Sequence, residues 1–300
     1  MRVGTFLILT TVFALVFTVP AFADMGAIVP SGDVALSEPG QKAVVLFNGE
    51  EEVLILGTDI AASGDAVALR FIPFPAEPAV SAASPQAFEA AARLVKQRQL
   101  KYVLQYRGGS REAGAVEVVL RKRLPGHDIT VVKVDDAAGF GAWVREYFAR
   151  NTIEVRNDWA RADSIAADYA SRGISYFAFD LVDLKADSNY VSPVQYRFKT
   201  GKLYYPLKTS NSFGGEGQID LILFAPCAWQ FIRMGFQAST SAQLNVKSLK
   251  AIYNDSKKFF KGKDVILQAF RYQGALSFDD DIFADTLSGM KELKLYSPRR

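Results

Sequence analysis

The sequence contains only one cysteine and one histidine among its 300 residues. Cys227 alone cannot form an intrachain disulfide or a cysteine-rich zinc ribbon, and His127 alone excludes a metal site built from several imidazoles. We therefore expect no metal and no other cofactor. Because the neighbours of Cys227 are apolar, we predict that its thiol is buried.

Motifs of catalysis and phosphate binding are also absent. The sequence has no Gly-x-Ser-x-Gly nucleophile elbow and no P-loop. Only His127 could serve a Ser–His–acid triad. Its neighbour Asp128 would point to the opposite face of a strand and could not orient the ring. These absences favour a protein without assembled catalytic groups, in which His127 is a candidate binding residue.

The chain carries little excess charge, with 35 basic and 32 acidic residues. A near-neutral chain lacks the strongly basic surface expected of a nucleic-acid binder, so we expect no nucleic-acid partner. Hydrophobic residues make up 49% of the sequence, which is enough for a sizeable core.

The N-terminus has the pattern of a secretory signal peptide over residues 1–23. Arg2 precedes an apolar run from Phe6 to Val19, and Pro20 precedes the small-residue site Ala-Phe-Ala. The pattern predicts cleavage between Ala23 and Asp24 and export to a periplasmic or extracellular location. The run is shorter than the roughly 20 residues that span a bilayer. An uncleaved signal would be the sole membrane contact.

The remaining chain divides into a leader, residues 24–41, and one globular domain, residues 42–300, which could consist of two packed lobes dividing near residue 155. Apolar alternation around turn signals predicts hairpins over 42–58 and 115–134. Helical spacing of apolar residues predicts four helices. We therefore predict an α+β fold with a mainly antiparallel sheet from hairpins and about four packed helices. The four helices are expected near residues 84–95, 140–148, 157–173 and 246–260.

Tyr204, Tyr205 and Lys208 are the main candidates for a recognition surface. Tyrosine combines apolar area with a polar tip, and lysine adds a charge. The alternative is that this segment is an ordinary strand edge. A run of aspartates, residues 279–281 with Asp285, could hold a hard cation, but we favour an acidic turn.

An alternative function is hydrolysis of an extracellular or envelope polymer by paired carboxylates. Asp180, Asp183 and Asp220 lie in apolar strands, where a buried acid could transfer protons. The sequence does not show which of these acids are close in space.

Four segments together resemble a known family. They are EPGQKAVVLFNGEEEVLIL at 38–56, HDITVVK at 127–133, YFAFDL at 176–181 and LYYPLKTS at 203–210. In this order they resemble a family of exported prokaryotic proteins defined only as a domain of unknown function, over about residues 25–225. The resemblance implies export and no known activity. From the signal peptide, the near-neutral charge, the large core and the absence of assembled catalytic groups, we expect a non-catalytic binding module or cell-envelope component. The sequence does not identify its partner; the candidates are an envelope component and a small ligand.

Overall fold

The computed structural model describes residues 27–28, 36–84, 86–98, 115–124, 127–135, 140–151, 153, 160–184, 191–212 and 216–284. The signal peptide expected over residues 1–23 lies outside this part of the chain, as do Asp285 and the residues after it.

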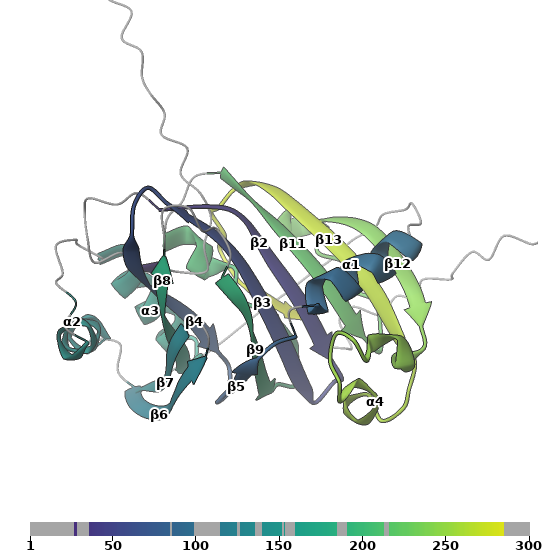
Figure 1. The fold of residues 1–300 in the computed structure, drawn as a ribbon, viewed down its shortest axis with the longest axis horizontal. Helices are drawn as coiled ribbons and strands as arrows, with labels where there is room; N and C mark the ends of the chain where they lie inside the picture. The colour runs from purple at the N-terminus through teal and green to yellow at the C-terminus, as the bar shows by residue number, and fades with distance from the viewer. Residues whose placement is uncertain are drawn as a thin grey trace, which may run out of the picture.

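A seven-stranded sheet forms the larger part of the fold (Figure 1). Its strand order is β12-β13-β11-β2-β3-β9-β5, and β11 runs parallel to β2 while the other neighbours are antiparallel. The sheet is therefore mixed. The strands are β2 (Leu36–Phe47), β3 (Glu51–Ala62), β5 (Ala79–Ala82), β9 (Val191–Lys199), β11 (Glu216–Ala225), β12 (Gln237–Leu244) and β13 (Val265–Ala275).

The hairpin predicted over 42–58 is confirmed as β2 and β3, although β2 begins at Leu36, before the predicted start. At its turn, the side chain of Asn48 accepts hydrogen bonds from the amides of Glu50 and Glu51, both at 2.8 Å. Gly49 has a φ of 96°, which favours glycine. Turn chemistry thus fixes the register of the two central strands.

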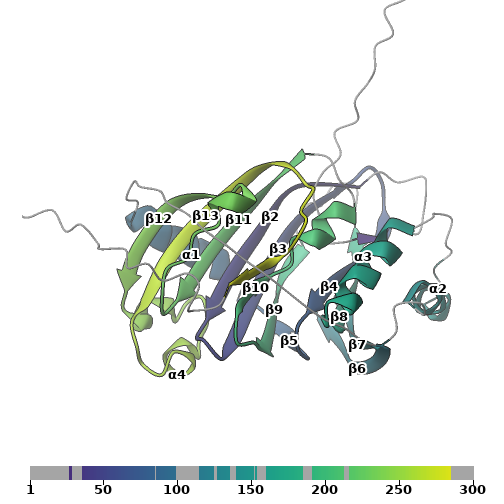
Figure 2. The ribbon, with the colours of Figure 1, turned by 180° about the vertical axis from the view of Figure 1, so that it is seen from behind.

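Both faces of the central strands β2 and β3 are buried, which explains their uninterrupted apolar runs. Along β2, Val45 and Phe47 belong to one core, whereas Val44 and Leu46 belong to another on the opposite face. Helix α1 (Ala87–Gln97) and α4 (Ser256–Phe259) lie over the second core (Figure 1). The view from behind shows α3 and β10 on the other side of the molecule (Figure 2).

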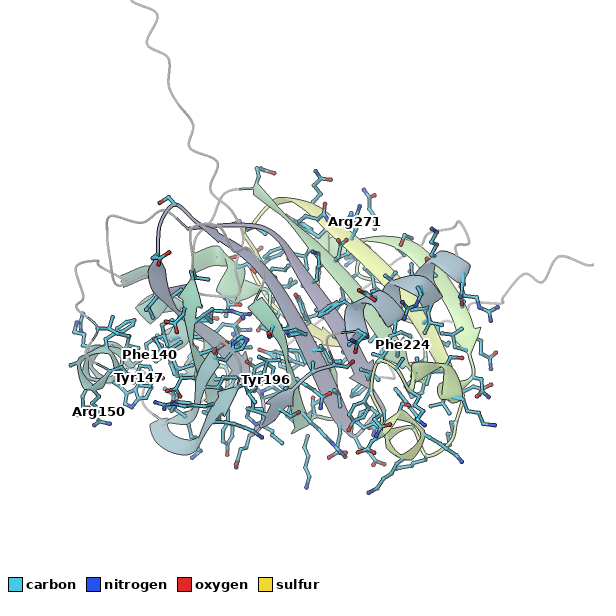
Figure 3. The ribbon with its side chains drawn as sticks, viewed as in Figure 1. Phe140, Tyr147, Arg150, Tyr196, Phe224 and Arg271 are labelled. Carbon is cyan, nitrogen blue, oxygen red and sulfur yellow. The ribbon has the colours of Figure 1, made fainter. Side chains whose placement is uncertain are left out.

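A five-stranded antiparallel sheet lies beside the larger one, in the order β1-β4-β8-β7-β6. Its hairpin β6–β7 confirms the one predicted over 115–134. Helices α2 (Phe140–Arg150) and α3 (Ala160–Ser171) pack on this part. The ring of Phe140, which is labelled in Figure 3, contacts three phenylalanine rings of β4 and β8. The strands are β1 (Ala27–Ile28), β4 (Ala66–Phe74), β6 (Ala115–Leu124), β7 (His127–Asp135) and β8 (Tyr176–Leu184); a separate pair joins β10 (Leu203–Tyr205) to β14 (Ile282–Ala284).

The predicted α+β fold with about four packed helices is wrong, because sheet dominates the molecule. Short or polar strands such as β5 and β12 carry no clear apolar alternation, so the sequence reading missed them. The helix predicted over 246–260 is instead a 3-10 helix, Val246–Leu249, followed by the four-residue α4. The apolar residues at helical spacing do face the core there, but two short helices position them rather than one continuous helix.

Cys227 is buried, as predicted, and burial raises the pKa of its thiol to about 11. Within the described residues, no helix is long and apolar enough to cross a membrane.

Candidate functional site

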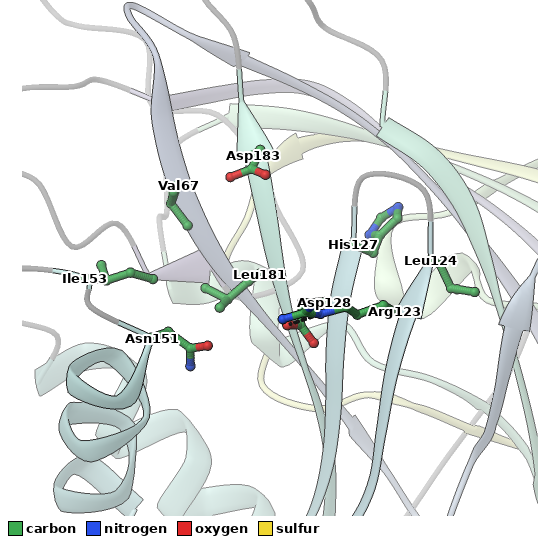
Figure 4. A pocket seen from close by; sticks show the side chains of 9 residues that line it. All are labelled: Val67, Arg123, Leu124, His127, Asp128, Asn151, Ile153, Leu181 and Asp183. Atoms are coloured by element: carbon green, nitrogen blue, oxygen red, sulfur yellow. Dashed lines mark hydrogen bonds and ion pairs between the residues drawn. The ribbon is translucent and has the colours of Figure 1, made fainter.

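A pocket of about 410 Å³ opens where β4, β6, β7 and β8 meet the segment after α2 (Figure 4). We call it the strand-end pocket. Apolar side chains of Val67, Leu181 and Ile153 combine with polar groups around them, a composition typical of small-molecule sites. The full lining is Val67, Arg123, Leu124, His127, Asp128, Asn151, Ile153, Leu181 and Asp183.

Strand alternation puts Asp128, Leu181 and Asp183 on the face of the sheet that points to the pocket. In the register of the sheet, Asp128 is opposite Leu181, and Val67 is opposite Asp183. Figure 4 shows Leu181 between Asn151 and Ile153 on one side and Asp128 and Arg123 on the other. The polar groups therefore come from β6, β7, β8 and the segment after α2, and they surround an apolar floor.

One cation in the pocket is already neutralised. The Nε atom of Arg123 lies 3.1 Å from Oδ2 of Asp128 and donates a hydrogen bond to it. Asp183 is exposed, and no described residue forms an ion pair with it. The pocket thus offers one carboxylate to a ligand.

His127 reaches the pocket's edge, but its ring belongs to a buried cluster on the other face of the sheet. Its Nδ1 lies 2.7 Å from Oδ2 of Asp180, and its Nε2 lies 2.8 Å from the carbonyl oxygen of Ser192. Arg70 forms an ion pair with Asp180 at 3.7 Å. We call Arg70, His127, Asp180 and Tyr196 the His127 cluster.

This cluster lies between the two sheets, because Arg70, His127 and Asp180 come from β4, β7 and β8, while Tyr196 comes from β9 of the larger sheet. Burial, and secondarily the charge of Asp180, raises the pKa of Tyr196. Both nitrogens of the His127 ring face oxygen atoms, so neither faces a serine, threonine or cysteine nucleophile. The arrangement is that of a structural contact rather than of a general base.

The three aspartates considered for hydrolysis do not converge. Asp180 and Asp183 lie on opposite faces of β8, since they are an odd number of residues apart. Asp220 lies on β11 of the other sheet, where Arg271 donates to it at 2.6 and 3.1 Å. No pair of these acids is placed to flank a bond in a substrate.

The tyrosines proposed for recognition are buried. Tyr204 donates its hydroxyl proton to the carbonyl of Pro73 at 3.0 Å, and its amide donates to Glu52 at 2.8 Å. Tyr205 donates to the side chain of Gln41 at 3.3 Å. Neither side chain is therefore available at the surface, whereas Lys208 is partly exposed and forms an ion pair with Asp168 at 2.9 Å.

Asp281 organises a second buried cluster, which the sequence reading did not find. It accepts hydrogen bonds from the hydroxyl of Tyr169 at 2.6 Å and from the amides of Leu207 and Lys208 at 2.8 and 2.9 Å. Burial raises its pKa to about 6, against the lowering effect of Arg172 and these hydrogen bonds. The only signal in the sequence was its place in an aspartate run.

The aspartate run has no cation-binding geometry in its described part. Asp280 accepts a hydrogen bond from Arg172 at 2.7 Å, and Asp281 faces hydrogen-bond donors. Nowhere among the described residues do three His, Cys, Asp or Glu side chains gather as metal ligands would. Asp285 lies outside the described residues.

Comparisons with known proteins identify a family and a distant structural likeness. A family model described as "Uncharacterized protein conserved in bacteria (DUF2330)" matches residues 19–237. The crystal structure of baculovirus P35 has a TM-score of 0.45 and 7% identity, over 85% of this chain and 97% of that one. The caspase-8/P35 complex has a TM-score of 0.40 and 6% identity, over 83% and 96%. No curated protein matches the chain.

Proposed function

Starting from the fact that the chain belongs to this uncharacterized bacterial family, we propose that it is an exported, non-catalytic binding protein that holds a small ligand in its strand-end pocket. The observation that carries the proposal is the convergence of Asp183, Asn151 and the Arg123–Asp128 pair around the apolar floor. Such a mixed lining suits recognition of a small molecule.

The charges in the pocket favour a ligand with one cationic amine and a short aliphatic part. Asp128 already has Arg123 as its counter-charge, so Asp183 is the carboxylate that an ammonium group would approach. The side chains of Val67, Leu181 and Ile153 would contact the aliphatic part. Charge-assisted hydrogen bonds of this kind are the stronger ones.

Binding of two probes of similar size and opposite charge tests this proposal. In NMR titrations of the mature protein, we expect n-butylamine to shift resonances of residues 181–183, and butyrate to shift none. Replacing Asp183 with Asn should weaken amine binding about tenfold, equivalent to about 1.4 kcal/mol. Glu77→Gln is the matched control, because Glu77 is an exposed acid outside the pocket. Equal binding of both probes, or amine binding unchanged by Asp183→Asn, would contradict the proposal.

Export is tested separately. The short apolar run and the Ala-Phe-Ala site support cleavage after Ala23. N-terminal sequencing of the protein from the envelope or culture medium should begin at Asp24. Recovery of the intact precursor from the cell interior would refute export without affecting the pocket.

A further inference from the structure

The His127 ring has more acceptors around it than a neutral imidazole can satisfy. Nδ1 faces Asp180 Oδ2 at 2.7 Å and Nε2 faces the Ser192 carbonyl oxygen at 2.8 Å. A neutral imidazole has one N–H, so one of its nitrogens would direct a lone pair at an oxygen atom. The side chains of His127 and Asp180 are 1% and 0% exposed, so water cannot intervene.

The carbonyl of Ser192 has no proton to give, so Nε2 must be the donor in that contact. A second proton is then needed between Nδ1 and Asp180. It could reside on the carboxyl group or on the ring. Arg70 lies 3.7 Å from Asp180 and favours the ionised carboxylate, which places the proton on Nδ1.

The strands around His127 carry charges of both signs. Asp180 on β8 is the anion of the cluster. Arg70 on β4 opposes a second positive charge, as does Lys122 on β6, whose ammonium donates to the carbonyl of Val80 at 2.7 Å. Tyr196 on β9 is neutral. Among the described groups, the direct contact with Asp180 is therefore what offsets the cost of charging the ring.

We propose that His127 is a buried imidazolium that joins the two sheets, donating one proton to Asp180 and the other to the backbone of β9. The second ring proton then allows the imidazole to donate to both sheets at the same time. Its loss would leave a lone pair facing an oxygen at less than 3 Å, so the ring would lose one of its two contacts, either the one with Asp180 of β8 or the one with the backbone of β9.

The test is direct because His127 is the sole histidine of the chain. In ¹⁵N NMR of the uniformly labelled mature protein at pH 7.5, we expect both ring nitrogens to show one-bond couplings to protons. A histidine free in solution is mostly neutral at that pH. A single protonated nitrogen at pH 7.5 in the wild-type protein would overturn the proposal, and this readout needs no variant.

Asp180→Asn provides the matched control. An asparagine amide can donate to Nδ1, so it satisfies the same geometry with a neutral ring. We expect this variant to have only Nε2 protonated at pH 7.5. If the ring of the variant keeps both protons, Asp180 is not the group that retains the second proton, and the proposal is refuted. Should the variant not fold, the wild-type spectrum still decides.

Discussion

At the scale of single residues, Glu52 shows the effect of burying a carboxyl group without a cation. It is fully buried, and its Oε2 accepts the amide of Tyr204 at 2.8 Å. Burial raises its pKa well above 4.5, despite that hydrogen bond. Above about pH 4.5 the unfolded chain releases a proton that the folded protein keeps, so stability falls as pH rises towards the folded pKa.

Glu52→Gln removes this penalty and keeps an oxygen acceptor for Tyr204. We expect the variant to gain in free energy of unfolding relative to the wild type, with a gap that widens from pH 5 to pH 8. Urea denaturation at both pH values measures it. Parallel changes in the two proteins would show that Glu52 is not the source of the pH dependence.

Tyr169 and Asp281 give a second prediction. The Asp281 pKa of about 6 lies above its usual 3.8, so this group too contributes a loss of stability as pH rises between those values. The Tyr169 hydroxyl bonds to the carboxylate and lowers that pKa. Tyr169→Phe should therefore raise it further and cost about 1–3 kcal/mol, more at pH 8 than at pH 5. Tyr205→Phe is the control. Its hydrogen-bond partner Gln41 does not titrate, so the free energy of unfolding lost in this variant should not depend on pH.

Reasoning from the sequence identified only some of the side chains that form the buried clusters. It singled out His127 and Asp180 separately, but nothing along the chain indicates that β7 and β8 place them 2.7 Å apart. It assigned Tyr204 and Tyr205 to a possible surface, whereas β10 is buried beneath its surroundings. The sequence shows which chemical group each side chain carries. The groups that it contacts depend on which strands pair in the folded protein.

At the scale of elements, α1 packs on β3 through a glycine. A Cβ atom at Gly57 would lie 2.7 Å from the Phe88 ring, closer than real side chains approach. Gly57→Ala should destabilise the protein by about 1–3 kcal/mol through overpacking. Gly201→Ala is the control, because a Cβ there meets nothing within 4 Å.

A double-mutant cycle by denaturant unfolding identifies the cause. If the clash with Phe88 is responsible, adding Phe88→Ala should remove most of the cost of Gly57→Ala. Additive losses in the double variant would place the strain elsewhere.

The elements themselves were predictable to different degrees. Strong alternation around a turn signal identified β2–β3 and β6–β7, and apolar spacing identified the sites of α1, α2 and α3. The dominance of sheet was not predictable, because β12 reads as a polar loop and becomes a strand through pairing with β13. Pairing partners, rather than local propensity, decide such segments.

At the scale of the whole molecule, strands from both ends of the chain share one sheet. The family match ends at residue 237, yet β13 pairs with β11, and β14 pairs with β10. A chain ending at residue 237 should therefore lose cooperative unfolding and expose β11. Circular dichroism and gel filtration check this against a chain ending at residue 284, which keeps every described element. A compact, cooperatively unfolding 237-residue form would contradict it.

The parallel pairing of β2 with β11 also has a kinetic consequence. Almost the whole five-stranded sheet is encoded between these two strands, so the central contact must wait until most of the polypeptide is available. Contacts of such large sequence separation slow folding, because chain entropy is lost before the contact forms. A slow folder remains unfolded for longer after synthesis, and an unfolded chain is compatible with the proposed export before folding is complete.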